Sequence, residues 1–243
     1  MRVLVAEDNM VNRELARHLL VQLGHDVVLA SDGNEVLARL EEQPCDLILM
    51  DLWMPQLDGL AACERIRASE KGTVRRTPII ALTAHAVKGD REACIAAGMD
   101  DYLVKPVRQP ALAKAIERIF FTGVRPVPDA APPERRAWLD PWEGVDSELL
   151  RKLAPLMLDS TTASLKALQG AHEARDWMKI EREAHTLKGS LGLFHVPRVV
   201  VTTKNLETAA RLKDDTRASA LLDDLAIELA AVQAEVRERC GMS

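Results

Sequence analysis

An apolar run that ends in a single carboxylate most constrains the fold of this chain. Residues 47–50 are all apolar, Asp51 follows directly, and residues 54–59 hold the turn formers proline, aspartate and glycine. A short apolar run bounded by turn signals predicts a strand buried on both faces, as in a parallel sheet covered by helices. Asp51 would then lie at the carboxyl end of a central strand, the edge where such sheets bind ligands. The alternative is a carboxylate that only caps the following turn or helix.

Four more short apolar runs alternate with amphipathic segments of helical length. The five expected strands are residues 3–6, 26–30, 46–50, 78–82 and 101–104. Between them, apolar residues recur at three- and four-residue spacing, which is typical of helices packed on one face. Strands that alternate with helices through short connections predict one doubly wound parallel sheet in an α/β domain, over residues 1–121.

Polar residues that follow the expected strands should meet at one edge of this sheet. These residues are Glu7, Asp8, Asp51, Thr83 and Lys105. Close carboxylates repel one another, and a hard divalent cation such as Mg²⁺, which prefers oxygen ligands, relieves the repulsion. Asp51 would then be a nucleophile that accepts a phosphoryl group, with Lys105 neutralising the phosphoryl oxygens and Thr83 donating a hydrogen bond. Singly, each residue also fits an ordinary cap, turn or strand end.

This motif set resembles the receiver domain of two-component response regulators. The motifs are Glu7-Asp8-Asn9, Asp51 with Met54-Pro55 and Asp58-Gly59, Ala81-Leu82-Thr83-Ala84, and Lys105-Pro106. The resemblance covers residues 1–121 and implies a flavodoxin-like (βα)5 fold and phosphorylation of Asp51 by the phosphohistidine of a histidine kinase. It implies a switch in which Thr83 moves toward the phosphoryl group and Tyr102 repacks the surface of the fourth helix, fifth strand and fifth helix. The implied Mg²⁺ ligands are Glu7, Asp8, Asp51 and the main-chain carbonyl of Trp53.

Two aromatic residues near the expected site bear on whether the domain is a phosphatase and on how fast the phosphoaspartate hydrolyses. Trp53 stands where haloacid-dehalogenase-like phosphatases place a second aspartate as general acid, which argues against turnover of a small substrate. Its ring would either exclude an attacking water from the phosphoaspartate or form a docking surface. His85 is either a base for hydrolysis of the phosphoaspartate or a solvated loop histidine.

A linker and a second domain follow. Residues 122–145 lack periodicity and are rich in proline, which predicts an extended spacer, and Trp138 and Trp142 are expected to dock on a neighbouring domain. Residues 146–243 carry helical apolar stripes throughout and predict an all-α up-down bundle.

One helix of this bundle carries a candidate phosphoacceptor. A helical wheel built on the apolar stripe places His185 toward solvent, with Lys188 on the same side and a gap at Gly189. The alternative is an incidental surface histidine. The stretch from His185 to Ser190 resembles the signature of histidine-containing phosphotransfer (HPt) domains. This resemblance implies a four-helix bundle in which His185 carries the phosphoryl group, Lys188 supports it, and Gly189 and Ser190 lie where a receiver docks.

One position departs from the HPt pattern. His195 stands where the family usually has glycine, so it is a second candidate histidine, although it lacks the lysine and glycine companions of His185.

The composition excludes other classes. A net charge of −5 argues against a nonspecific nucleic-acid binder. No apolar run approaches the length of a spanning helix, which predicts no direct membrane contact, and the dispersed cysteines predict neither a zinc site nor disulfides and fit a reducing cytoplasm.

We therefore expect a phosphorelay protein whose partners are a histidine kinase and a separate receiver-domain protein. No ATP-binding box is visible, and the chain would fit the C-terminal part of a hybrid sensor kinase. The alternative function is a receiver-gated interaction module without relay through His185.

Overall fold

The computed structural model describes residues 1–83, 88–122, 147–191 and 196–242. These residues form two compact units, Met1–Ala137 and Trp138–Ser243. The predictions for His85, His195 and the linker tryptophans lie outside the described residues, as does the side chain of Ser190.

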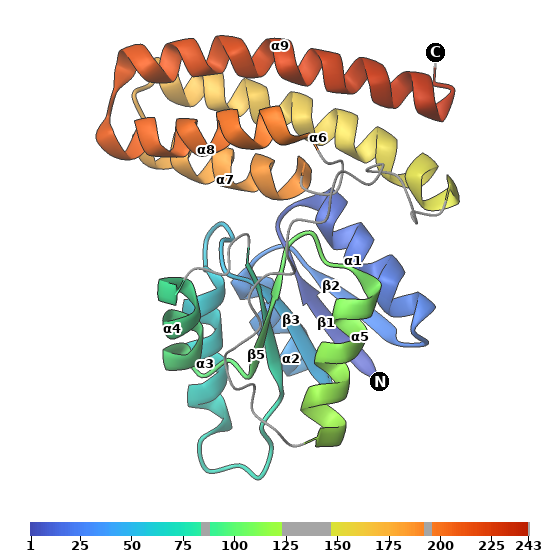
Figure 1. The fold of residues 1–243 in the computed structure, drawn as a ribbon. Helices are drawn as coiled ribbons and strands as arrows, with labels where there is room; N and C mark the ends of the chain where they lie inside the picture. Colours follow the sequence, from blue (N-terminus) through green and yellow to red (C-terminus); the bar gives the residue numbers. More distant parts are fainter. Residues whose placement is uncertain (84–87, 123–146, 192–195, 243) are drawn as a thin grey trace. The chain divides into compact units, whose positions relative to one another are not determined.

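A five-stranded parallel sheet forms the centre of the first unit (Figure 1). Its strands are β1 (Arg2–Ala6), β2 (Asp26–Ala30), β3 (Leu47–Asp51), β4 (Ile79–Thr83) and β5 (Asp101–Val104). They lie in the order β2-β1-β3-β4-β5, and every neighbouring pair is parallel. Because β3 runs one residue further than expected, Asp51 is the last residue of the central strand. The predicted doubly wound sheet is confirmed.

Helices cover both faces of the sheet (Figure 1). They are α1 (Met10–Gln22), α2 (Gly33–Glu42), α3 (Gly59–Glu70), α4 (Lys88–Ala97) and α5 (Gln109–Glu117), which continues as the π-helical turn η1 (Arg118–Thr122). Side chains of β1, β3 and β4 that point to one face form a core with α2, α3 and α4. The helices α1 and α5 lie on the opposite face (Figure 1). Full burial of the central strands therefore follows from cover on both sides.

Short polar side chains cap the helices that follow the first three strands. Asn9 caps α1, Asp32 caps α2 and Asp58 caps α3, each by accepting hydrogen bonds from backbone N–H groups of the first turn. Glu7 and Asp8 alone separate β1 from the Asn9 cap of α1, so both stay close to the sheet edge.

The second unit is a bundle of α6 (Ser147–Glu173), α7 (Trp177–Leu191), α8 (Pro197–Leu212) and α9 (Asp215–Cys240). Each helix packs on the next, and α9 also packs on α6, which closes the bundle. Its core holds aliphatic residues such as Leu153, Leu187 and Leu225. This unit confirms the all-α prediction for the C-terminal domain. Among the described residues, no helix combines the length and the apolar character that crossing a bilayer requires.

Candidate functional site

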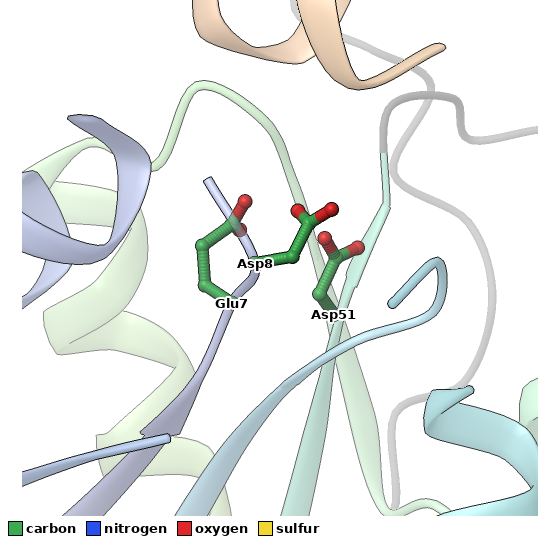
Figure 2. A group of neighbouring side chains, drawn as sticks. All are labelled: Glu7, Asp8 and Asp51. Atoms are coloured by element: carbon green, nitrogen blue, oxygen red, sulfur yellow. The ribbon is translucent and has the colours of Figure 1, made fainter. Parts of the chain in front are cut away.

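Three carboxylates meet at the carboxyl edge of the sheet. Glu7 and Asp8 follow β1, and Asp51 ends the adjacent strand β3 (Figure 2). One carboxylate oxygen from each residue lies within 4.8 Å of the others. Glu7 is 1% exposed and Asp51 is 4% exposed, so their charges are withdrawn from water. Mg²⁺ prefers hard oxygen ligands and keeps several waters. The three carboxylates supply such ligands close together, and Asp8 is partly exposed to solvent, so the set fits Mg²⁺.

Lys105 lies between two of these carboxylates. Its Nζ atom is 2.6 Å from Asp51 Oδ2 and 2.6 Å from Glu7 Oε2. Its backbone N–H donates to the carbonyl oxygen of Thr83, 2.8 Å away, which fixes the start of the loop after β5 against the end of β4. The structure therefore brings together the acidic cluster, Lys105 and Thr83, as the strand-end argument predicts.

The charges in this cluster shift the pKa values of Asp51 and Lys105. Burial, followed by repulsion from Glu7, raises the pKa of Asp51 to about 8, while the ammonium group of Lys105 opposes the rise. Burial lowers the pKa of Lys105, but the carboxylates of Asp51 and Glu7 outweigh this effect and raise it. Lys105 therefore stays protonated, and it is the cation on which the buried carboxylates depend.

Three further predicted residues surround this edge. Thr83, the last residue of β4, is buried, and Trp53 is 48% exposed. The backbone N–H of Trp53 donates to Asp51 Oδ1 at 3.3 Å. Tyr102 is half-buried on the edge strand β5 and packs against the core on the α2–α4 side. The metal-ligand role of Trp53 and the switch roles of Thr83 and Tyr102 remain predictions.

Gly59 allows the start of α3 to pack closely against the backbone of Asp51. A Cβ atom at position 59 would lie 2.0 Å from the carbonyl oxygen of Asp51, far inside van der Waals contact. The Gly59 N–H also donates to the carbonyl oxygen of Leu52 at 3.1 Å. Glycine is needed here because the start of α3 crosses directly over the end of β3.

His185 lies on α7 in the bundle, and its surroundings correct the helical-wheel prediction. The side chain of His185 is only 20% exposed, that of Lys188 is 6% exposed, and Gly189 is buried. The wheel treats α7 as an isolated helix with one buried stripe. In the bundle, the flank that carries His185 and Lys188 faces Glu207 of α8, so these side chains do not point freely into solvent.

Glu207 is a functional candidate that the sequence analysis missed. Its Oε1 atom lies 3.3 Å from Nδ1 of His185 and 2.6 Å from Nζ of Lys188. Burial raises the pKa of Glu207, but hydrogen bonds from His185 and Lys188 outweigh burial and lower it. One sequence signal was present, because Glu207 continues the buried stripe of Thr203 and Ala210 at four- and three-residue spacing. A carboxylate in a core-facing stripe implies a cationic partner.

Comparison with known families matches both units. Residues 3–117 match the model of the response regulator receiver domain, and residues 152–235 match the model of the Hpt domain. The chain carries a receiver domain followed by an HPt domain. This pair of domains belongs to two-component phosphorelay signalling, which confirms the functional class inferred from the motifs.

Curated relatives carry the same pair of regions within longer proteins. The chain is 31% identical to the sensor histidine kinase GacS of Pseudomonas protegens, over 97% of this chain and 27% of the relative. It is 31% identical to the signal transduction histidine-protein kinase BarA of Escherichia coli, over 94% of this chain and 25% of the relative. The chain thus spans about a quarter of the length of these relatives.

A solved structure is similar to the receiver domain alone. The receiver domain of the sensor histidine kinase PA1611 from Pseudomonas aeruginosa, solved with a magnesium ion in its active-site cleft, is 47% identical. The match covers 48% of this chain and 94% of that chain, with a TM-score of 0.45.

Proposed function

We propose that Asp51 accepts a phosphoryl group from the phosphohistidine of a histidine kinase, and that His185 relays a phosphoryl group to or from a receiver aspartate. The observation that carries this proposal is the position of Asp51 at the end of the central strand, with Lys105 2.6 Å from its Oδ2 atom. Glu7 and Asp8 complete an oxygen-donor set beside it.

The first transfer is a displacement at phosphorus. A carboxylate oxygen of Asp51 attacks the phosphorus atom, the P–N bond of the donor breaks, and the imidazole nitrogen keeps the bonding electron pair and takes up a proton. The ammonium group of Lys105 neutralises charge on the phosphoryl oxygens from its place beside Asp51. Thr83, buried at the end of β4, donates a hydrogen bond to the same oxygens. When bound, Mg²⁺ supplies additional positive charge and relieves repulsion among the carboxylates.

The second transfer uses the contact between His185 and Glu207. Because Glu207 Oε1 lies beside Nδ1, the neutral imidazole carries its proton on Nδ1 and leaves the lone pair on Nε2. Nε2 attacks the phosphorus atom of an aspartyl phosphate, the P–O bond to the carboxylate breaks, and the electron pair returns to the aspartate. Lys188 offsets the negative charge of Glu207, which would otherwise repel the incoming phosphoryl group.

The partners and the setting follow from this chemistry. A histidine kinase supplies the phosphoryl group, and a separate receiver-domain protein exchanges it with His185. The four cysteines, all in described parts of the chain, are free thiols, which fits a reducing cytoplasm. We assign no nucleic-acid partner, in keeping with the net charge of −5.

Labelling with acetyl phosphate tests the first transfer. The wild-type chain and Asp51→Asn are incubated with acetyl phosphate, with Mg²⁺ or with a chelator, and intact masses are measured. We expect phosphorylation of the wild type only when Mg²⁺ is present, and none of Asp51→Asn. A phosphoryl group that persists on Asp51→Asn would rule out Asp51 as the acceptor.

A further inference from the structure

The first turn of α1 reaches back to the loop that carries Glu7 and Asp8. Asn12 donates its Nδ2–H to Glu7 Oε1 at 3.1 Å. Arg13 donates from one guanidinium nitrogen to the carbonyl oxygens of Glu7 and Asp8, at 2.7 Å and 3.3 Å. Asn9 caps the same turn by accepting from two backbone N–H groups. Two side chains of the first turn, Asn12 and Arg13, therefore hold the loop of two acidic residues, and Asn9 caps the turn that carries them.

Asn12 completes the hold on the carboxylate of Glu7. The ammonium group of Lys105 forms an ion pair with Oε2 at 2.6 Å, and Asn12 donates a hydrogen bond to Oε1, so each oxygen has its own polar neighbour. An ion pair at one oxygen leaves the plane of the carboxylate free to turn, and the directional hydrogen bond from Asn12 to the other oxygen fixes that plane. Without Asn12, a carboxylate that is 1% exposed would also have no water to replace the lost hydrogen bond.

Arg13 acts on the backbone of the acidic loop, since its guanidinium group donates to main-chain carbonyl oxygens. Its contacts with two successive carbonyl oxygens fix the peptide planes on either side of the Asp8 Cα atom. The direction of the Asp8 side chain follows from this backbone, and Asp8 is the most exposed of the three acidic residues. Arg13 thereby directs the Asp8 side chain toward the cluster through the backbone.

We propose that Asn12 and Arg13 are positioning residues that set the Mg²⁺ affinity of the cluster formed by Glu7, Asp8 and Asp51. This inference rests on the proposed function. Residues that orient metal ligands through hydrogen bonds change metal affinity by about 10- to 100-fold when they are removed. We expect about a 10-fold loss of Mg²⁺ affinity for Asn12→Ala and for Arg13→Ala.

Two measurements on the full chain separate positioning from general damage. Isothermal titration calorimetry gives the Mg²⁺ affinity directly, and the rate of labelling by acetyl phosphate is then followed as a function of Mg²⁺ concentration. For both variants, the Mg²⁺ concentration at half-maximal rate should rise about 10-fold, while the rate at saturating Mg²⁺ stays near that of the wild type. A fold defect would instead lower the rate at every Mg²⁺ concentration.

Matched variants serve as controls. Arg17→Ala removes the same charge one turn further along α1, where Arg17 pairs with Glu14, and Asn34→Ala removes an exposed amide at the start of α2. Both should bind Mg²⁺ like the wild type. Asn12→Leu keeps the approximate size of the side chain and raises the helix propensity but removes the donor, and it should lose affinity as Asn12→Ala does. Arg13→Lys keeps a donor and should lose less than Arg13→Ala.

The outcomes are distinct. If the wild type binds Mg²⁺ and both alanine variants bind within about twofold of it, the inference is wrong and the proposed function stands. An equal loss of Mg²⁺ affinity in Arg17→Ala would also overturn the inference, because the loss would then follow from the removed positive charge and not from the lost hydrogen bonds. If the wild type binds no Mg²⁺, the metal part of the proposed function fails, and the inference fails with it.

Discussion

Glu207 on α8 places its Oε1 atom 3.3 Å from Nδ1 of His185 on α7. Lys188, one turn beyond His185, lies 2.6 Å from the same oxygen. The lysine expected to support a phosphoryl group is therefore paired with a carboxylate that faces the phosphoacceptor. In this arrangement the lysine acts on His185 through Glu207, and the ring is oriented before any partner arrives.

The first prediction concerns this contact. Glu207→Ala should slow transfer to His185 by about 10- to 100-fold, because a hydrogen bond to a charged group contributes about 1.5–3 kcal/mol. Glu207→Gln keeps an acceptor oxygen and should slow transfer less. The rate is measured from a separate phosphorylated receiver to the full chain carrying Asp51→Asn. Glu235→Ala, which removes an exposed carboxylate on α9, is the control. An unchanged rate in Glu207→Ala would show that Glu207 does not orient the ring.

The second prediction concerns stability in acid. The pKa of Glu207 is lowered in the folded chain, although burial alone would raise it, because His185 and Lys188 donate to it. Such a group contributes stability that is present above the unfolded-state pKa of about 4.3 and is lost as the pH falls through the folded-state pKa. The wild type should therefore lose stability more steeply than Glu207→Gln as the pH falls below about 4.3.

Urea unfolding at several pH values measures this difference. Trp177 reports on the bundle when the other tryptophans are replaced by phenylalanine in both proteins. If the two proteins lose stability equally with falling pH, the ion pairs of Glu207 contribute nothing to folding.

The third prediction concerns Gly59. Gly59→Ala forces a Cβ atom to within 2.0 Å of the Asp51 carbonyl oxygen, so the end of β3 must move. We expect a loss of about 1–3 kcal/mol in stability and slower labelling of Asp51. Gly170→Ala is the matched control, because nothing lies within 4 Å of a Cβ atom at that position in α6. That substitution should stabilise the chain by about 0.5–1 kcal/mol. Equal effects at both glycines would contradict the close approach at Asp51.

The fourth prediction concerns Lys105. Lys105→Ala leaves Asp51 and Glu7 buried without their cation, and breaking a buried ion pair in this way costs about 3–5 kcal/mol. The receiver domain should unfold at a lower temperature in the presence of a chelator, and Mg²⁺ should restore part of the loss. Thermal unfolding with and without Mg²⁺ measures this, with Lys71→Ala as an exposed control. A variant as stable as the wild type in chelator would show that Lys105 does not balance these charges.

The sequence was sufficient to predict the fold and the acidic site of the receiver domain, because short local patterns identify the strands and the residues at their ends. The apolar run before Asp51 identifies a central strand, and the parallel topology then brings Glu7, Thr83 and Lys105 to the same edge without further assumptions. The strands β3 and β4 end one residue later than expected, since hydrogen bonding continues past the last apolar side chain, and the other three strands end where the sequence predicts. The side chains that reach back from α1, Asn12 and Arg13, gave no comparable signal because their partners depend on loop geometry.

The environment of His185 was predicted less well because it depends on a second helix. Periodicity identified the bundle and the helix that carries His185. It did not identify which flank α8 covers, and Glu207 lies on α8, whereas His185 lies on α7. A pairing between helices is set by side-chain packing across the interface, which a single helical wheel does not contain.

The most direct test of the account is to locate the phosphoryl groups on the chain after incubation with acetyl phosphate and Mg²⁺. Wild type, Asp51→Asn and His185→Gln are compared, and label is divided into a hydroxylamine-sensitive fraction on aspartate and a base-stable fraction on histidine. We predict both fractions in the wild type, only the hydroxylamine-sensitive fraction in His185→Gln, and neither in Asp51→Asn. A wild-type chain that carries label on Asp51 but never on His185 would contradict relay from Asp51 to His185, and base-stable label on His185→Gln would place it on another histidine.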